Sequence, residues 1–199
     1  MNHISFDAGY YHSYKSRNDI KTGLVLDHIG PVASVLDIGC NSGYMSEALL
    51  KSGKAETCHG VELSRGIVSG SLLEDSRFRF YEEDIIDFKF TQTYDAILYM
   101  AVHHHVFGKY GRDAALNLWH KIVNHCGRVM FFETGLLTGQ GNLYWRDEMA
   151  KHYSSDKEHM EELLSLAGGR VESIETLAAL SMNGTDRPIY KITFRRGSP

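Results

Sequence analysis

Apolar residues in this chain gather in short runs that alternate with amphipathic segments. The strand-like runs lie near residues 34–38, 57–61, 78–81, 94–100 and 128–133. The segments with helical periodicity lie near residues 43–52, 65–74, 112–125 and 156–168. Strands that alternate with helices are typical of a largely parallel sheet covered by helices on both faces. The pattern therefore predicts an α/β, doubly wound fold.

The two ends of the chain depart from this alternation. Residues 1–30 precede the first strand-like run and form an N-terminal segment with helical character. At the other end, extended runs at 170–178 and 189–195 meet around Asn183-Gly184, a dipeptide favoured in tight hairpin turns. We therefore expect an antiparallel hairpin at the C-terminal edge of the sheet, within a single domain that spans residues 1–199.

The first strand-like run leads into a glycine turn, in the sequence Val35-Leu-Asp-Ile-Gly-Cys-Asn-Ser-Gly-Tyr44. Glycines at the first strand-to-helix turn of such a sheet let the backbone come close to a ligand. A dinucleotide-binding turn would need glycines at positions 41 and 44, where this chain has Asn41 and Tyr44. Asp37 would also repel a pyrophosphate at the helix N-terminus. The turn therefore favours a cationic, nucleotide-like ligand.

This segment carries a family resemblance. Asp37-Ile-Gly39-Cys-Asn41-Ser-Gly43 resembles the D-x-G-x-[GN]-x-G motif of class I S-adenosylmethionine-dependent methyltransferases. The cofactor of that family has a sulfonium and an ammonium group and no phosphate, which suits Asp37. The resemblance implies a Rossmann-like, seven-stranded, mostly parallel sheet. It also implies that S-adenosyl-L-methionine is bound by Asp37, Gly39, Asn41 and Gly43.

Further cofactor contacts implied by the resemblance follow in the order that the family requires. Glu62 and Leu63 end the second run, where a carboxylate can accept both ribose hydroxyls. Asp84 and Ile85 end the third run and match the acidic and apolar pair placed around the adenine. Tyr99 lies in the fourth run. Taken singly, Glu62 or Asp84 could instead cap a following helix.

Cysteine usage and the N-terminus indicate the compartment. Cys40, Cys58 and Cys126 are odd in number and lack C-x-x-C spacing, which argues against a disulfide framework or a zinc site. The first residues lack the basic and apolar regions of a signal peptide, and no apolar run approaches the roughly 18 to 20 residues of a membrane span. We therefore expect a cytoplasmic protein with no metal and no membrane partner.

The charge balance bears on the partner. A net charge of −4 gives no overall positive field that would attract nucleic acid. Local basic patches near the two ends leave nucleic-acid binding open as an alternative. Their residues are Lys15, Arg17 and Lys21 near the start, and Arg187, Lys191, Arg195 and Arg196 near the end. We expect a small-molecule acceptor, and the sequence does not fix the oligomeric state.

One segment does not fit the minimal alternation of strands and helices. Residues 135–156 follow the fifth run and combine glycines with an aromatic and charged stretch that contains Tyr144 and Trp145. Ligands bind beyond the carboxyl ends of the strands in such sheets, so we expect this insertion to cover the acceptor. The alternative is a surface helix–loop excursion anchored by a packed tryptophan.

The candidate catalytic groups follow the fourth run. Methyl transfer from a sulfonium is an in-line displacement, and a general base matters only when the nucleophile carries a proton. His103 and His105 would share one side of an extended segment and His104 the other, so His103 and His105 are the candidate bases. Glu133 ends the fifth run at the same rim and is a candidate substrate contact. All of these side chains could instead be structural.

A narrower resemblance covers roughly residues 10–195. Short blocks that include Arg17 to His28, Tyr99 to His105 and Thr185 to Arg187 are similar in order to the enzymes that carboxymethylate wobble hydroxyuridine in tRNA. That resemblance implies carboxy-S-adenosylmethionine, with Lys21 and Arg187 near the extra carboxylate or the acceptor. Ile20 and Thr22 stand where that family is aromatic, and for this reason we expect ordinary S-adenosylmethionine.

These observations predict an S-adenosylmethionine-dependent methyltransferase that acts on an oxygen of a small molecule. One alternative is a tRNA-modifying methyl or carboxymethyl transferase. A second alternative, from another class, is a non-catalytic module that only binds S-adenosylmethionine. A nicotinamide enzyme is disfavoured because the glycines it would need are absent.

Overall fold

A computed structural model describes residues 8–140, 143–182 and 184–195, with the side chains of residues 8–16 left out of the description. Residues 1–7 of the N-terminal segment, residues 141–142 of the insertion, Asn183 of the predicted hairpin turn and Arg196 of the basic patch lie outside the described residues, and Lys15 has no described side chain.

The described strands form one seven-stranded sheet in the order β3-β2-β1-β4-β5-β7-β6. Strands β1 to β5 are parallel to one another, whereas β7 is antiparallel to both of its neighbours. The strands are β1 (Val32–Ile38), β2 (Ala55–Glu62), β3 (Phe78–Glu82), β4 (Tyr94–Met100), β5 (Cys126–Glu133), β6 (Val171–Met182) and β7 (Thr185–Phe194). The predicted doubly wound sheet and its C-terminal antiparallel hairpin are confirmed.

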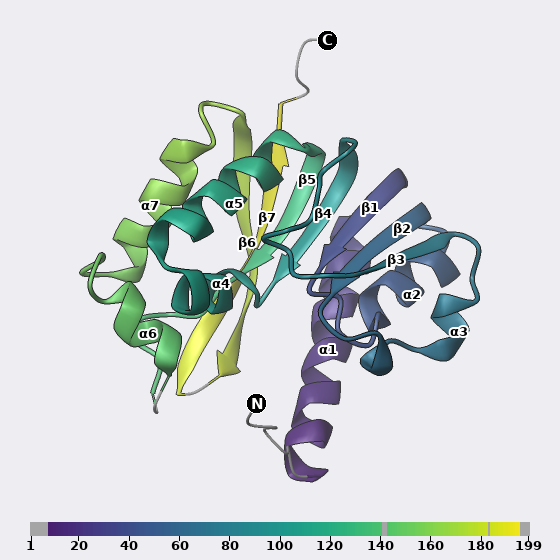
Figure 1. The fold of residues 1–199 in the computed structure, drawn as a ribbon, viewed down its shortest axis with the longest axis horizontal. Helices are drawn as coiled ribbons and strands as arrows, with labels where there is room; N and C mark the ends of the chain where they lie inside the picture. The colour runs from purple at the N-terminus through teal and green to yellow at the C-terminus, as the bar shows by residue number, and fades with distance from the viewer. Residues whose placement is uncertain (1–7, 141–142, 183, 196–199) are drawn as a thin grey trace.

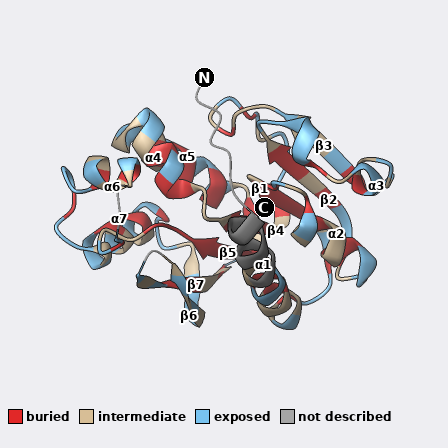
Figure 2. Cartoon of the chain, turned by 90° about the horizontal axis from the view of Figure 1, so that it is seen from below, coloured by how far each residue is buried: buried red, intermediate tan, exposed pale blue. Residues whose placement is uncertain are grey.

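Helices cover both faces of this sheet, as Figures 1 and 2 show. Helices α1, α2 and α3 lie on one face, and α4 to α7 lie on the other. Their bounds are α1 (Ala8–His28), α2 (Tyr44–Lys51), α3 (Gly70–Leu73), α4 (His103–Tyr110), α5 (Arg112–Asn124), α6 (Tyr144–Met149) and α7 (Asp156–Leu166), with a single 3-10 turn η1 (Arg65–Ile67). None of the described helices has the length and apolar character needed to cross a membrane.

Strand β4 shows why the sheet needs cover on both sides. Its side chains alternate between the faces, so Ala96 and Leu98 pack with the α1 to α3 layer while Ile97 and Tyr99 pack with the α4 to α7 layer. All four are completely buried. A central parallel strand therefore reads as a continuous apolar run in the sequence.

Two local expectations need correction. The predicted helix over 65–74 is wrong, because Val68 and Ser69 are extended, with ψ of 138° and 129°, and separate η1 from α3. Gly66 and Gly70 in this short stretch weaken helix formation, and tertiary packing does not restore it. Helix α6 lies inside the insertion, where only the alternative of a helix–loop excursion places a helix.

Candidate active site

The glycine turn between β1 and α2 is built from residues with left-handed backbone. Gly39, Asn41 and Gly43 have φ of 68°, 51° and 78°, which glycine adopts readily and asparagine tolerates. The amides of Gly39 and Cys40 both donate to the carbonyl of Val61 on β2, at 2.9 and 3.2 Å. The turn is therefore fixed against the neighbouring strand, with α2 starting directly after Gly43.

Two carboxylates meet at this turn. Asp37 is buried at the end of β1, and its Oδ2 accepts a hydrogen bond of 2.7 Å from Ser46 Oγ. Glu62, at the end of β2, accepts hydrogen bonds from the amides of Asn41 and Leu63, at 3.1 and 2.7 Å. Neither carboxylate has an ion-pair partner among the described residues. A cationic ligand would supply the missing positive charge.

The titration of Asp37 reflects this uncompensated charge. Burial raises the pKa of Asp37 to about 6; the hydrogen bond from Ser46 opposes the rise, and the negative charge of Glu62 adds to it. A positive group bound between the two carboxylates would offset the negative charge of Glu62 and so lower the pKa of Asp37. The electrostatics of the turn thus fit a sulfonium or ammonium group and disfavour a phosphate.

The third predicted landmark lies beside helix α4. Ile85 is buried, and Asp84 accepts hydrogen bonds from the amide of Ile86, from Lys109 Nζ at 3.1 Å and from the Tyr110 hydroxyl. Burial on its own would raise the pKa of Asp84, but these hydrogen bonds and the charge of Lys109 lower it. The carboxylate therefore anchors the end of α4. Leu63, whose amide donates to Glu62, is 61% exposed.

The strand order reverses between β1 and β4, so these carboxyl ends form a topological switch point. Strand β4 leaves the sheet through Ala101, a non-glycine residue with φ of 59°, whose amide donates to the carbonyl of Glu133 at 2.8 Å. The histidine run follows at once. The chain thereby carries the three histidines from the switch point onto the α4 to α7 face.

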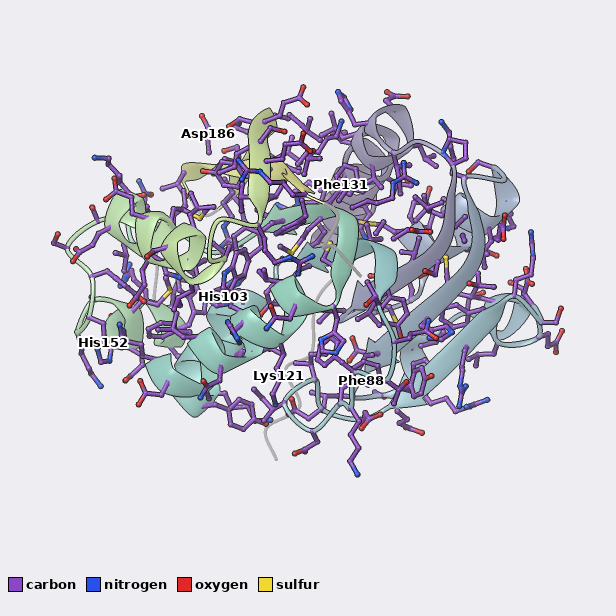
Figure 3. The ribbon with its side chains drawn as sticks, turned by 90° about the horizontal axis from the view of Figure 1, so that it is seen from above. Phe88, His103, Lys121, Phe131, His152 and Asp186 are labelled. Carbon is purple, nitrogen blue, oxygen red and sulfur yellow. The ribbon has the colours of Figure 1, made fainter. Side chains whose placement is uncertain are left out.

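The predicted extended conformation of the histidine run is wrong. His103 begins helix α4, and residues two apart in a helix point in different directions, so His103 and His105 do not share a side. His103, labelled in Figure 3, is completely buried, and its Nδ1 lies 3.1 Å from the Tyr99 hydroxyl. Burial, reinforced by the nearby His159, holds its pKa well below the usual value. His103 and Tyr99 therefore belong to the core beneath α4 and not to the rim.

The other two histidines have separate positions. His104 is buried, and its Nδ1 accepts a hydrogen bond of 2.9 Å from the amide of Gly135, which ties α4 to the start of the insertion. His105 is exposed, with its Nδ1 2.9 Å from the Tyr144 hydroxyl and the two rings stacked at 6.0 Å. Partial desolvation and then the charge of Arg187 lower the pKa of His105. His105 is the histidine of the run that faces outward.

The insertion packs on α4 through its aromatic pair. Trp145 is buried, and a Cβ on Gly108 would lie 2.7 Å from the Trp145 Cα, so the two helices touch backbone to backbone. Tyr144 is 58% exposed beside His105. The alternative of a packed tryptophan therefore describes Trp145, whereas Tyr144 is presented at the surface. The role of Gly108 had no signal in the sequence pattern.

The remaining predicted contacts form a charged cluster next to Trp145. Lys21 on α1 forms an ion pair with Glu133 at the end of β5, and both are buried. Arg187 on β7 is buried with its guanidinium 5.7 Å from the centre of the Trp145 ring. No described helix begins at Thr134, so Glu133 acts as an ion-pair partner and not as part of a cap.

A cavity of about 370 Å³ lies between the end of β5, β7 and α7. It is lined by Thr134, Leu136, Asp156, Lys157, His159, Met160, Pro188 and Tyr190. None of the residues predicted from the sequence to bind cofactor or substrate lines it.

The sheet order, the glycine turn and the paired carboxylates agree with the arrangement expected from the resemblance to class I S-adenosylmethionine-dependent methyltransferases. In agreement, residues 35–127 match the family model described as "Methyltransferase domain". These residues run from β1 to the start of β5 and include the turn, both carboxylates and the histidine run. The match thus indicates a methyltransferase domain over this part of the chain.

Solved structures with this fold include three methyltransferases of low sequence identity. WbdD, a bifunctional kinase-methyltransferase, superposes with a TM-score of 0.69 at 18% identity over 90% of this chain and 36% of WbdD. NodS of Bradyrhizobium japonicum WM9, an N-methyltransferase solved with S-adenosyl-L-homocysteine, gives 0.62 at 15% identity over 92% of this chain and 87% of NodS. The magnesium protoporphyrin IX methyltransferase ChlM of Synechocystis PCC 6803, solved with S-adenosylmethionine, gives 0.59 at 15% identity over 91% and 79%.

The chain thus spans about a third of the length of WbdD. A comparison with curated proteins found no significant sequence match.

Proposed function

We propose that this protein is an S-adenosylmethionine-dependent methyltransferase that methylates an oxygen of a small molecule. The observation that carries the proposal is the pair of carboxylates, Asp37 and Glu62, held at the switch point without a cationic partner among the described residues. NodS and ChlM have been solved with S-adenosylhomocysteine and S-adenosylmethionine, which supports the same cofactor for this chain.

The residues around the turn fit such a cofactor. Gly39, Asn41 and Gly43 shape the turn, while Asp37 holds the positive end of the ligand and Glu62 accepts the ribose hydroxyls. The exposed Leu63, together with Asp84 and Ile85, provides an apolar and acidic boundary for the adenine. When bound, S-adenosylmethionine supplies an activated methyl group on its sulfonium. Tyr99 is completely buried in the core between β4 and the α4 to α7 layer, so its support of this site is indirect.

His105 is the group best suited to receive a proton from the acceptor. Its lowered pKa leaves the imidazole neutral at pH 7, and its exposed position puts it in reach of a substrate. If Nδ1–H donates to the Tyr144 oxygen, Nε2 is left to accept a proton from an acceptor hydroxyl. Completely buried His103 has no such access, so the proposal keeps His105 as the base.

The insertion and the compartment complete the proposal. Tyr144 presents its hydroxyl to His105 from residues 135–156, which supports the role of this insertion as the cover of the acceptor. The chain acts as a single domain. Three buried free cysteines are consistent with a reducing compartment such as the cytoplasm.

Ligand-dependent thermal unfolding of the full chain tests the cofactor. We expect S-adenosylmethionine and S-adenosylhomocysteine to raise Tm and NAD to leave it unchanged, because only a ligand that binds the folded state stabilises it. A matching rise with NAD and none with the adenosyl compounds would overturn the proposal.

Methyl transfer is then measured with labelled S-adenosylmethionine on matched hydroxyl and amine compounds. Label on the hydroxyl members supports the oxygen assignment, and label on the amines alone contradicts it. Cofactor binding with no transfer to any member would favour the non-catalytic module. The narrower resemblance to tRNA enzymes stays a prediction from the sequence.

A further inference from the structure

Four charged side chains from three elements meet beside the proposed acceptor position. They are Arg17 and Lys21 on α1, Glu133 at the end of β5 and Arg187 on β7. Lys21 is 6% exposed, Glu133 1% and Arg187 3%. Lys21 and Glu133 form an ion pair, which leaves the buried Arg187 and the half-buried Arg17 without a carboxylate of their own in the cluster. The cluster therefore carries a buried excess of positive charge.

This excess is not satisfied within the described protein. Nε of Arg187 and Nε of Arg17 are buried without a hydrogen-bond partner, and Arg187 forms no ion pair with a described residue. The Trp145 ring, 5.7 Å away, offers only a cation–π contact, which is weak beside the cost of burying an unpaired cation. A guanidinium held in this way has a planar set of donors ready for an oxyanion.

The cluster lies next to the group proposed to act as base. After burial, the charge of Arg187 is the main cause of the lowered pKa of His105, and Arg187 and Lys21 both contribute to the lowered pKa of His104. Glu133 ends the strand next to β4, from which the histidine run departs. A molecule that places a hydroxyl at His105 would thus have a second group within reach of Arg187.

We propose that Arg187, supported by Lys21 and Arg17, binds an anionic oxygen group of the acceptor, a carboxylate or a phosphate. The inference rests on the proposed function, since it names the substrate class of the same site. Arg187 and Lys21 give the site a specificity that the neutral surroundings of Tyr144 and His105 do not supply. An acceptor without the anion would leave the buried guanidinium unpaired and would bind poorly.

Small anions serve as the probes, on the full chain saturated with S-adenosylhomocysteine. Thermal unfolding is followed with rising phosphate or acetate at constant ionic strength, with chloride as the balancing salt. We expect a saturable rise in Tm for the wild type, and Arg187→Met to need an anion concentration at least about tenfold higher for the same rise. The stronger response, to phosphate or to acetate, identifies the anion.

Two controls separate binding from folding. Arg79→Gln removes an exposed arginine on the distant strand β3 and should keep the full anion response. Arg187→Met should unfold, without added anion, at the same temperature as wild type or higher, because it removes a buried cation whose Nε has no hydrogen-bond partner among the described residues. Both variants should retain S-adenosylhomocysteine binding.

Methyl transfer gives the second readout. Wild type should methylate hydroxy acids in preference to their amides, and Arg187→Met should lose this preference.

The proposal is overturned if neither anion raises Tm, or if Arg187→Met responds as wild type does. Stabilisation by single-stranded RNA alone would overturn it in favour of nucleic acid, and a copurified cofactor heavier by a carboxyl group would assign the cluster to the donor. Absent S-adenosylhomocysteine binding would instead overturn the proposed function, and the anion response of the unliganded protein would still decide this inference.

Discussion

Oγ of Ser46 donates a hydrogen bond of 2.7 Å to Oδ2 of Asp37, joining the first turn of α2 to the end of β1. Both side chains are buried. The bond fixes the carboxylate beside the glycine turn and limits the rise in its pKa that burial causes. The ionised form of Asp37 is therefore available near neutral pH, where it can bind a cation.

Cofactor affinity should depend on the ionisation of Asp37. Its pKa is raised to about 6, so we expect S-adenosylmethionine binding to weaken as pH falls through 6, where protonation removes the negative charge. Asp37→Asn should lose about 1 to 3 kcal/mol of binding free energy and most of this pH dependence. Ser46→Ala should move the pH dependence to higher pH. Isothermal titration calorimetry between pH 5.5 and 8 measures all three.

Ser71→Ala is the matched control, since Ser71 is an exposed serine on α3. It should bind the cofactor as wild type does. Wild-type affinity that is flat with pH, together with full affinity in Asp37→Asn, would show that the carboxylate does not contact the ligand.

Helix α6 should be sensitive to one methyl group on α4. A Cβ on Gly108 would meet the Trp145 Cα at 2.7 Å, and backbone cannot yield as a flexible side chain can. Gly108→Ala should therefore lower the free energy of unfolding by about 1 to 3 kcal/mol, as overpacking does. Gly23→Ala on α1, where a Cβ meets nothing within 4 Å, should instead be neutral or raise stability by about 0.5 to 1 kcal/mol. Urea unfolding of both variants decides the point, and equal midpoints would mean that α6 does not press on α4.

The sequence predicts most of the fold because its signals are local. The runs at β1 to β5 and the glycines at 39 and 43 act through their own backbone or their nearest neighbours. Glu62 could be placed because parallel strands end at the same edge of a sheet. The histidine run could not be read correctly, since the left-handed turn at Ala101 and the aromatic core beneath His103 decide that it is helical. These are tertiary effects that override local pattern.

The charged cluster also could not be predicted from the sequence, because its residues lie far apart in the chain. Lys21, Glu133 and Arg187 are separated by more than fifty residues from one to the next, and their meeting depends on β7 pairing beside β5. The narrower resemblance singled out Lys21 and Arg187 without indicating that both are buried. Their shared excess of charge is visible only once the sheet order is known.

The core histidines should make the protein sensitive to acid. His159 stacks on His103 at 5.2 Å, and burial, opposed by the charge of Glu162, lowers the pKa of His159 to about 4. An unfolded histidine has a pKa near 6.5, so between pH 6.5 and 4 the unfolded chain binds more protons and stability falls as pH falls. We expect His159 alone to account for a loss of about 2 kcal/mol at pH 5.

Chemical unfolding at pH 5 and pH 7.5 measures this loss. His159→Gln should reduce the difference between the two pH values, since the side chain no longer titrates. His120→Gln, at an exposed position on α5, should leave the difference as it is in wild type. A wild-type protein equally stable at both pH values would contradict the buried neutral pair.

The last prediction concerns catalysis by His105. Partial desolvation and the positive charge of Arg187 both disfavour the imidazolium, so the pKa of His105 lies below 6.5. If His105 is the base for an acceptor hydroxyl, the pH–rate profile should rise through a pKa below 6.5 and then stay level through neutral pH, because only the neutral imidazole accepts the proton. His105→Ala should lower kcat by about 10² to 10⁴ and remove this rise.

Two further variants test this role of His105. Tyr144→Phe, which deletes the hydroxyl 2.9 Å from Nδ1, should keep the rise while lowering kcat less, since it removes only the group that orients the ring. His103→Ala is the contrasting variant: it should lower Tm while leaving the position of the rise unchanged, because His103 is buried against Tyr99. If His105→Ala keeps full turnover and the wild-type profile, the acceptor is already anionic at the reacting oxygen and needs no base.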